Sequence, residues 1–143
     1  MKKLIKPLLV VVFCVYLLYI LKYTVGLYLL GIRQWFNHNL IVRGIGFSPE
    51  FNLIPFTNTA TVTFLLNILL FVPFGLLLPL ISNVKTVGKV MVFGIVACLI
   101  IEFLQMGIQG RITDINDLIA NTVGTLIGYY IYKLGKKILE GSQ

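Results

Sequence analysis

The feature that most restricts the fold of this chain is an apolar run over residues 61–81 that contains no charged side chain. At 1.5 Å per residue, a helix over this run is about 30 Å long, which matches the hydrocarbon thickness of a bilayer. Further apolar runs cover residues 4–30, 87–106 and 117–134. Since hydrocarbon offers the backbone no hydrogen-bond partner, we expect each run to be a transmembrane helix.

The composition supports the same class of protein. The chain is 58% hydrophobic and only 12% charged, about half the charged fraction of a typical soluble domain. We therefore predict an all-α, polytopic membrane protein in which residues 1–143 form a single domain of four transmembrane helices packed as a small bundle. The net charge of +7 does not indicate nucleic acid, because the lysines lie at the ends of apolar runs, where contact with membrane lipids is expected.

The placement of lysine and arginine predicts the orientation. If the N-terminus is cytoplasmic, eight lysines lie on the cytoplasmic side, namely Lys2, Lys3, Lys6, Lys85, Lys89, Lys133, Lys136 and Lys137. Only Arg33, Arg43 and Arg111 then lie outside, with Lys22 at the outer edge of the first helix. This is a positive-inside bias. It places both termini in the cytoplasm, which requires an even number of spans.

Polar side chains gather near the predicted outer ends of three helices. At a rise of about 1.5 Å per residue along each predicted helix, Asn67, Glu102 and Asn121 lie within about one turn of the same depth in the membrane. Gln105 lies three residues after Glu102 on the same face. The last helix opens with Asp114 and Asp117, which share a face with Asn121, and Arg111 is the nearest cation.

Two interpretations of this cluster stay open. Ionisable groups inside spans are costly and usually mark a partner, a cavity or a function, and Glu102 could remain ionised opposite Arg111. Alternatively, Asp114 and Asp117 cap the last helix, the asparagines hydrogen-bond neighbouring helices, and Arg111 only neutralises Glu102.

Small residues line the same face of the last helix. Ala120, Gly124 and Gly128 recur at a spacing of four, which lets helix backbones approach closely. Their partner could be a helix of the same chain or a second copy in a homo-oligomer. In residues 61–81, Pro73 should kink the helix and release a backbone carbonyl one turn earlier.

Other chemistry has little support in the sequence. Cys14 and Cys98 both lie in apolar runs, where a small buried hydrophobe is the favoured interpretation. There is no Ser-His-Asp set and no Cys/His spacing for a metal. We therefore expect no metal and no cofactor, and a catalytic role, if there is one, would fall to Glu102 and Asp117.

Several motifs occur in order and together resemble those of a known family. They are Asn52-Leu53-Ile54-Pro55-Phe56, Asn67-Ile68-Leu69-Leu70-Phe71-Val72-Pro73-Phe74-Gly75, Glu102-Phe103-Leu104-Gln105, Arg111-Ile112-Thr113-Asp114-Ile115-Asn116-Asp117, and Asn121-Thr122-Val123-Gly124 with Gly128-Tyr129. This set is similar to that of the VanZ-like family over about residues 52–129. The motif residues match at Asn67, Glu102, Gln105, Arg111, Asp114, Asp117 and Asn121, the same set that the depth argument selects.

The resemblance implies a multi-pass protein of the bacterial cytoplasmic membrane. The namesake of the family is associated with low-level resistance to teicoplanin, a lipid-bearing glycopeptide that targets cell-wall precursors. Membership alone does not transfer that role.

Three functions are then consistent with the sequence. The first is a cell-envelope protein whose outer polar pocket engages a lipid-linked precursor or a lipoglycopeptide and so contributes to glycopeptide tolerance. The second is an intramembrane enzyme acting on a lipid-linked cell-wall precursor, with Glu102 as base and Arg111 holding a phosphate or oxyanion. The third is a structural membrane subunit in which the polar cluster only locks the fold.

Overall fold

The computed structural model describes residues 2–26, 50–56, 61–107 and 112–141 of the chain, and the remaining residues are not described. Four α-helices dominate this part of the chain, and they are α1 (Lys2–Leu21), α4 (Thr61–Ile81), α5 (Val87–Gln105) and α6 (Ile115–Gly141). A short π-helix, η1 (Lys22–Gly26), continues α1. The expectation of an all-α membrane protein is thereby confirmed.

Three helical segments are long and apolar enough to cross a membrane by length and composition, and they are Ile5–Val25, Thr61–Ile81 and Val87–Gln105. Helix α6 is longer than the predicted residues 117–134, since it begins at Ile115 and ends at Gly141. Its last turns contain several charged residues, and Lys136 and Glu140 form an ion pair there, whose Nζ and Oε1 lie 3.5 Å apart. A fourth crossing by α6 stays a prediction.

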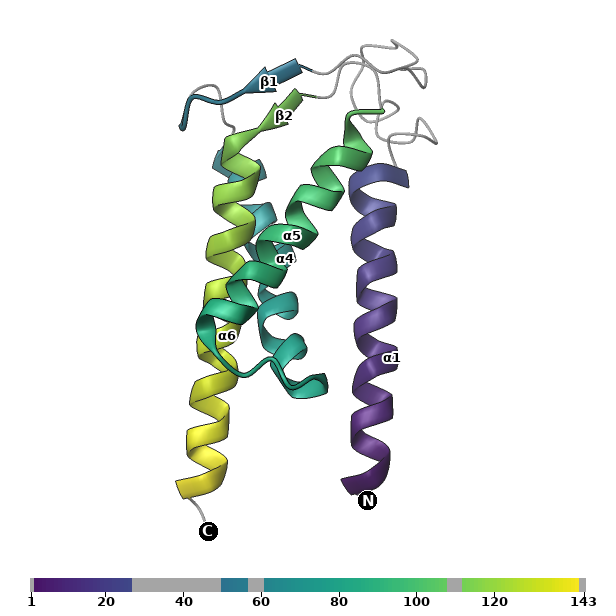
Figure 1. The fold of residues 1–143 in the computed structure, drawn as a ribbon, viewed down its shortest axis with the longest axis vertical. Coiled ribbons are helices and arrows are strands. Elements are labelled where there is room, and N and C mark those ends of the chain that lie inside the picture. Colours follow the sequence, from purple (N-terminus) through teal and green to yellow (C-terminus); the bar gives the residue numbers. More distant parts are fainter. Residues whose placement is uncertain (1, 27–49, 57–60, 108–111, 142–143) are drawn as a thin grey trace.

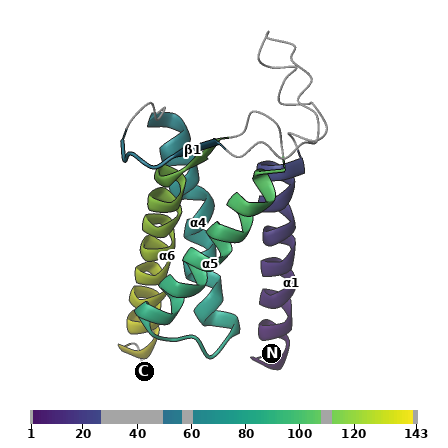
Figure 2. The ribbon, with the colours of Figure 1, turned by 45° about the horizontal axis from the view of Figure 1, so that its top comes forward.

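Helix α1 begins and helix α6 ends on the same side of the molecule (Figure 1). Helix α5 runs obliquely across α4 and α6, and α1 stands beside them in both views (Figures 1 and 2). The opposite end carries two short parallel strands, β1 (Glu50–Asn52) and β2 (Ile112–Asp114), which pair Glu50 with Ile112 and Asn52 with Asp114. This pair was not predicted, because three residues are too few to show an alternating pattern.

Helices α4 and α6 are in backbone contact through glycines. A Cβ added to Gly124 would lie 2.2 Å from the carbonyl oxygen of Ile68, and one added to Gly128 would lie 2.0 Å from that of Val72. Ala120 is fully buried on the same face. The small-residue face therefore packs against α4 of the same chain, and a homo-oligomer would need another surface.

Helix α1 is hydrogen-bonded to α4 close to Pro73. Pro73 has no N–H to donate back along the helix, which leaves the preceding turn short of a hydrogen bond. In that turn the Leu70 carbonyl oxygen accepts a hydrogen bond of 2.6 Å from the Tyr16 hydroxyl. This hydrogen bond anchors α1 to α4 beside the proline, next to the Leu69 carbonyl that Pro73 leaves without its helical donor. The outward side chains of α1, such as Leu8 and Leu18, are exposed as a lipid-facing surface requires.

Candidate functional site

The polar side chains selected from the sequence lie at the β-strand end of the helices, and most of them are buried. Less than a tenth of the surface of Glu102, Gln105, Asp117 and Asn121 is exposed, although these residues lie among apolar helices. Asn67 and Asp114 are half-buried. Arg111 and its predicted pairing with Glu102 lie outside the described residues.

Asn67 and Asp117 join α4 to α6. The Asn67 Nδ2 donates a hydrogen bond of 2.5 Å to Oδ1 of Asp117. This contact lies two turns from Gly124, where the α6 backbone reaches the carbonyl of Ile68. A carboxyl oxygen is a suitable acceptor for an amide donor of this kind. Asn67 therefore contacts Asp117, which lies one turn nearer the start of α6 than Asn121, the residue expected at the same depth.

A second contact joins α5 to α6 one turn deeper. The Asn121 Nδ2 donates to the Cys98 Sγ at 3.0 Å. The Thr125 hydroxyl, fully buried, donates to the Asn121 carbonyl oxygen at 2.9 Å. Among the described residues, the Asn121 Oδ1 has no hydrogen-bond partner. Cys98 thus accepts a polar contact, whereas its apolar context in the sequence predicted only a small hydrophobe.

The geometry of these two helices brings the carboxylates together. Glu102 lies one turn after Cys98 on α5, and Asp117 lies one turn before Asn121 on α6. Because α5 and α6 run in opposite directions, both steps lead toward the β-strand end (Figure 1). Glu102 and Asp117 therefore share a level above the Asn121–Cys98 contact, in a buried environment that offers acceptors for hydroxyl or amine donors.

Gln105 connects α5 to the end of the first helix. Its Nε2 donates to the Thr24 carbonyl oxygen at 3.0 Å. Thr24 lies in η1, and its own hydroxyl donates to the Ile20 carbonyl oxygen at 2.8 Å. A π-turn changes the regular hydrogen-bond ladder of a helix, and Gln105 supplies a donor there. Gln105 therefore links α5 to η1 at the end of α1.

Asp114 and Asn116 organise the start of α6. The Asp114 Oδ1 accepts hydrogen bonds from the Asn116 N–H at 2.9 Å and from its Nδ2 at 2.7 Å. The Asn116 Oδ1 accepts from the Phe56 N–H at 2.7 Å, where Phe56 has a φ of 61°. Asp114 therefore has the capping role that we considered. Asn116, fully buried, was missed as a site residue, although its position two residues after Asp114 is typical of an Asx turn.

A polar cleft of about 290 Å³ opens beside this turn. It is lined by Glu50, Phe51, Asn52, Ile112 and Asp114. Around it, Phe51, Leu53, Ile54 and Phe56 are more than half exposed. The β-strand end thus combines acidic and amide groups with an apolar rim, as expected of a surface that meets a membrane interface.

The comparisons with known proteins agree with the motifs. The model of the VanZ/LLP1 family matches residues 10–136. The chain belongs to this family. The resemblance predicted from the sequence is thereby confirmed.

Among curated proteins, Protein VanZ of Enterococcus faecium is 39% identical to the chain over 89 residues, which is 60% of this chain and 54% of that relative. The chain therefore matches about half the length of this relative. No solved structure matches the chain.

Proposed function

We propose that this VanZ/LLP1 family member is a multi-pass protein of the bacterial cytoplasmic membrane that binds an amphipathic or lipid-linked ligand at its outer face and so contributes to glycopeptide (teicoplanin) tolerance. The proposal rests on two buried carboxyl groups, those of Glu102 and Asp117, which lie at the same depth beneath the cleft lined by Asp114. Ionisable groups at membrane depth are costly unless they are partnered or used. Similarity to Protein VanZ supports the link to the cell envelope.

The charge distribution favours the outer face for this site. Lys85 lies in the α4–α5 turn, and Lys133, Lys136 and Lys137 lie on the last part of α6, all at the end opposite to β1 and β2. By the positive-inside rule the lysine-rich end is cytoplasmic, and the β-strand end faces outward. Lipid-linked wall precursors and lipoglycopeptides are encountered at that face.

The ligand is expected to use both kinds of surface. Its polar head group would contact Asp114 and Asp117, with Arg111 as the nearest cation in the sequence. Its acyl chain would lie beside the apolar rim that includes Phe51 and Ile54, which are exposed by 56% and 65%. Such a split between a few polar groups and an apolar remainder is usual for amphipathic ligands.

The two buried carboxyl groups, Glu102 and Asp117, favour one alternative, an intramembrane enzyme acting on a lipid-linked precursor. Two acidic groups in different environments can divide the roles of acid and base. Turnover of such a lipid in proteoliposomes, lost in Asp117→Asn, would support catalysis, whereas binding without turnover would support the first function.

The test measures teicoplanin susceptibility in a strain that depends on this protein. Glu102→Gln and Asp117→Asn remove a buried carboxylate while keeping the shape of the side chain, and we expect both to raise susceptibility. The matched control is Glu140→Gln, which makes the same change on the exposed last turn of α6 and should leave susceptibility unchanged. Unchanged susceptibility in both buried variants at normal membrane abundance would rule out the proposed pocket.

A structural subunit predicts a different result. If the cluster only holds the helices together, susceptibility should follow the amount of folded protein in the membrane. Asp117→Asn keeps an oxygen that can accept from Asn67, so it should preserve folding better than Asp117→Leu. Loss of tolerance in Asp117→Asn with normal folding therefore separates ligand binding from packing.

A further inference from the structure

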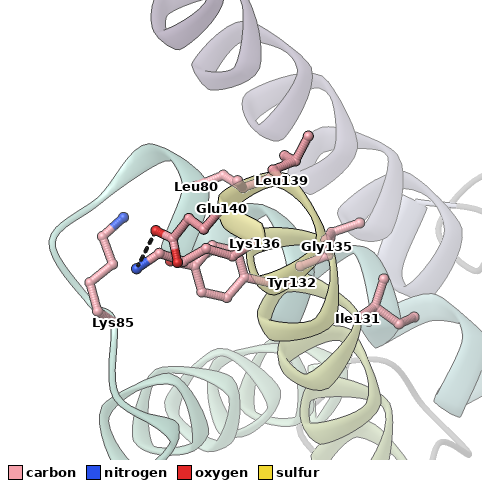
Figure 3. A pocket seen from close by; sticks show the side chains of 9 residues that line it. Leu80, Lys85, Ile131, Tyr132, Gly135, Lys136, Leu139 and Glu140 are labelled. Carbon is pink, nitrogen blue, oxygen red and sulfur yellow. Dashed lines mark ion pairs between the residues drawn. The ribbon is translucent and has the colours of Figure 1, made fainter. Parts of the chain in front are cut away.

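A second pocket lies at the other end of the molecule, between the last turns of α4 and the last turns of α6. Its volume is about 540 Å³, within the range of sites that hold small ligands. One part of its lining is apolar, from Leu76, Leu80, Ile131 and Leu139, and another part is charged (Figure 3). The pocket is far from the polar cluster of Glu102 and Asp117.

The charged part is formed by two lysines and one glutamate. Lys85 and Lys136 extend to the same side of the pocket, where Glu140 also lies (Figure 3). The Lys136 Nζ is 3.5 Å from the Glu140 Oε1. Two ammonium groups against one carboxylate leave a net positive charge, in a chain whose overall charge is +7.

Lys85 is held in place by its surroundings. Its Nζ donates a hydrogen bond to the Pro79 carbonyl oxygen and lies 5.8 Å from the centre of the Tyr132 ring. Its backbone carbonyl oxygen accepts from the Tyr129 hydroxyl at 3.1 Å. An ammonium group fixed over an aromatic ring loses little further freedom when an anion binds, so the site is preorganised.

The position of the pocket relative to a bilayer selects the kind of anion. Helix α4 has 21 residues and spans about 30 Å, the thickness of the hydrocarbon core. Lys85 follows its last residue by four positions, and Lys136 is about 31 Å along α6 from Ile115. Both ammonium groups therefore lie at the level of lipid phosphates, while Leu76 and Ile131 lie at acyl-chain depth.

We propose that this pocket binds an anionic phospholipid of the leaflet at the lysine-rich end, with its phosphate between Lys85 and Lys136 and one acyl chain along Leu76, Leu80 and Ile131. Lysines at a membrane surface attract anionic lipids, and tyrosines such as Tyr132 favour the same interface. A soluble phosphate would use only the charged part and leave the apolar wall uncovered. This site is independent of the proposed outer ligand.

The experiment measures lipid retention by native mass spectrometry after purification from vesicles of phosphatidylglycerol and phosphatidylcholine. The unmodified protein should retain phosphatidylglycerol in preference to phosphatidylcholine. Lys136→Gln and Lys85→Gln should each lower that retention about five-fold, as expected for one lysine near a lipid surface. The matched control is Lys89→Gln, which removes the same charge from an exposed position of α5 outside the pocket and should change retention little.

Two further variants separate the charged and apolar parts. Leu80→Trp fills the apolar wall without altering charge and should also lower retention, so the proposal stays testable if a lysine variant folds poorly. Glu140→Gln removes the competing carboxylate and should raise retention. Equal losses in Lys89→Gln and Lys136→Gln would overturn the site, and so would full displacement of the lipid by millimolar inorganic phosphate, which would reveal a phosphate site.

Discussion

Replacing Gly128 with alanine should weaken the contact between α6 and α4. The added Cβ would lie 2.0 Å from the Val72 carbonyl oxygen, 2.8 Å from the Leu76 nitrogen and 3.0 Å from the Gly75 Cα. All three atoms belong to the backbone of α4, so none can turn aside as the end of a flexible side chain would. The two helices must instead separate locally.

The size of the effect follows from how far the distances to the added Cβ fall below 3.0 Å. Contacts of a Cβ shorter than 3.0 Å essentially do not occur, so the backbones must move apart by about 1 Å, at a cost of about 1–3 kcal/mol for overpacking. Alanine recovers up to about 1 kcal/mol because it favours a helix more than glycine does. With the full propensity gain, we expect Gly128→Ala to lower the free energy of unfolding by about 0–2 kcal/mol, and by about 1–3 kcal/mol relative to a helical Gly→Ala change that meets no neighbouring atom.

The assay is reversible unfolding in bicelles, with Gly135→Ala as the matched control. Gly135 lies on the same helix, and nothing lies within 4 Å of a Cβ added there. This variant should therefore be as stable as the unmodified protein or slightly more stable. Equal unfolding free energies for Gly128→Ala and Gly135→Ala would refute the close approach of α6 to α4.

Two further predictions concern single hydrogen bonds. Asn116→Ala removes the acceptor of the Phe56 N–H and should speed the hydrogen exchange of the Phe56 amide at least several-fold, because a net hydrogen bond contributes about 1 kcal/mol; unchanged exchange would contradict the anchoring of this segment to α6. Tyr16→Phe removes the donor to the Leu70 carbonyl and should lower the free energy of unfolding by about 0.5–1.5 kcal/mol, whereas no change in the same bicelle assay would show that this hydrogen bond does not stabilise the contact of α1 with α4.

The sequence predicts the helices well where hydropathy decides their ends. The expected residues 61–81 agree with Thr61–Ile81, and the expected residues 87–106 agree with Val87–Gln105 to within one residue. Helix α6 was underestimated because the charged residues Lys133, Lys136, Lys137 and Glu140 interrupt the apolar run in its last turns. A helix can continue past the membrane wherever its residues favour it and ion pairs such as Lys136–Glu140 support it.

The candidate site could be predicted in part. Spacing along each helix gives the depth of Asn67 and Asp117, but their hydrogen bond also requires the rotation of each helix about its axis, which the spacing of one helix does not contain. The β1–β2 pair joins segments 62 residues apart in the chain and has only three residues per strand. For the same reason, the contact of Phe56 with Asn116 had no local signal.

Burial of apolar surface does not hold these helices together in a bilayer, because lipid tails are as apolar as the side chains themselves. Close backbone contact and polar bonds must do so, and α6 has both, through Gly128 and through Asp117. Packing therefore accounts for the hydrogen bond between Asn67 and Asp117, but a neutral amide at 117 would serve that purpose as well. The buried carboxyl group is what packing does not require, and it is the feature on which the proposal of a ligand site rests.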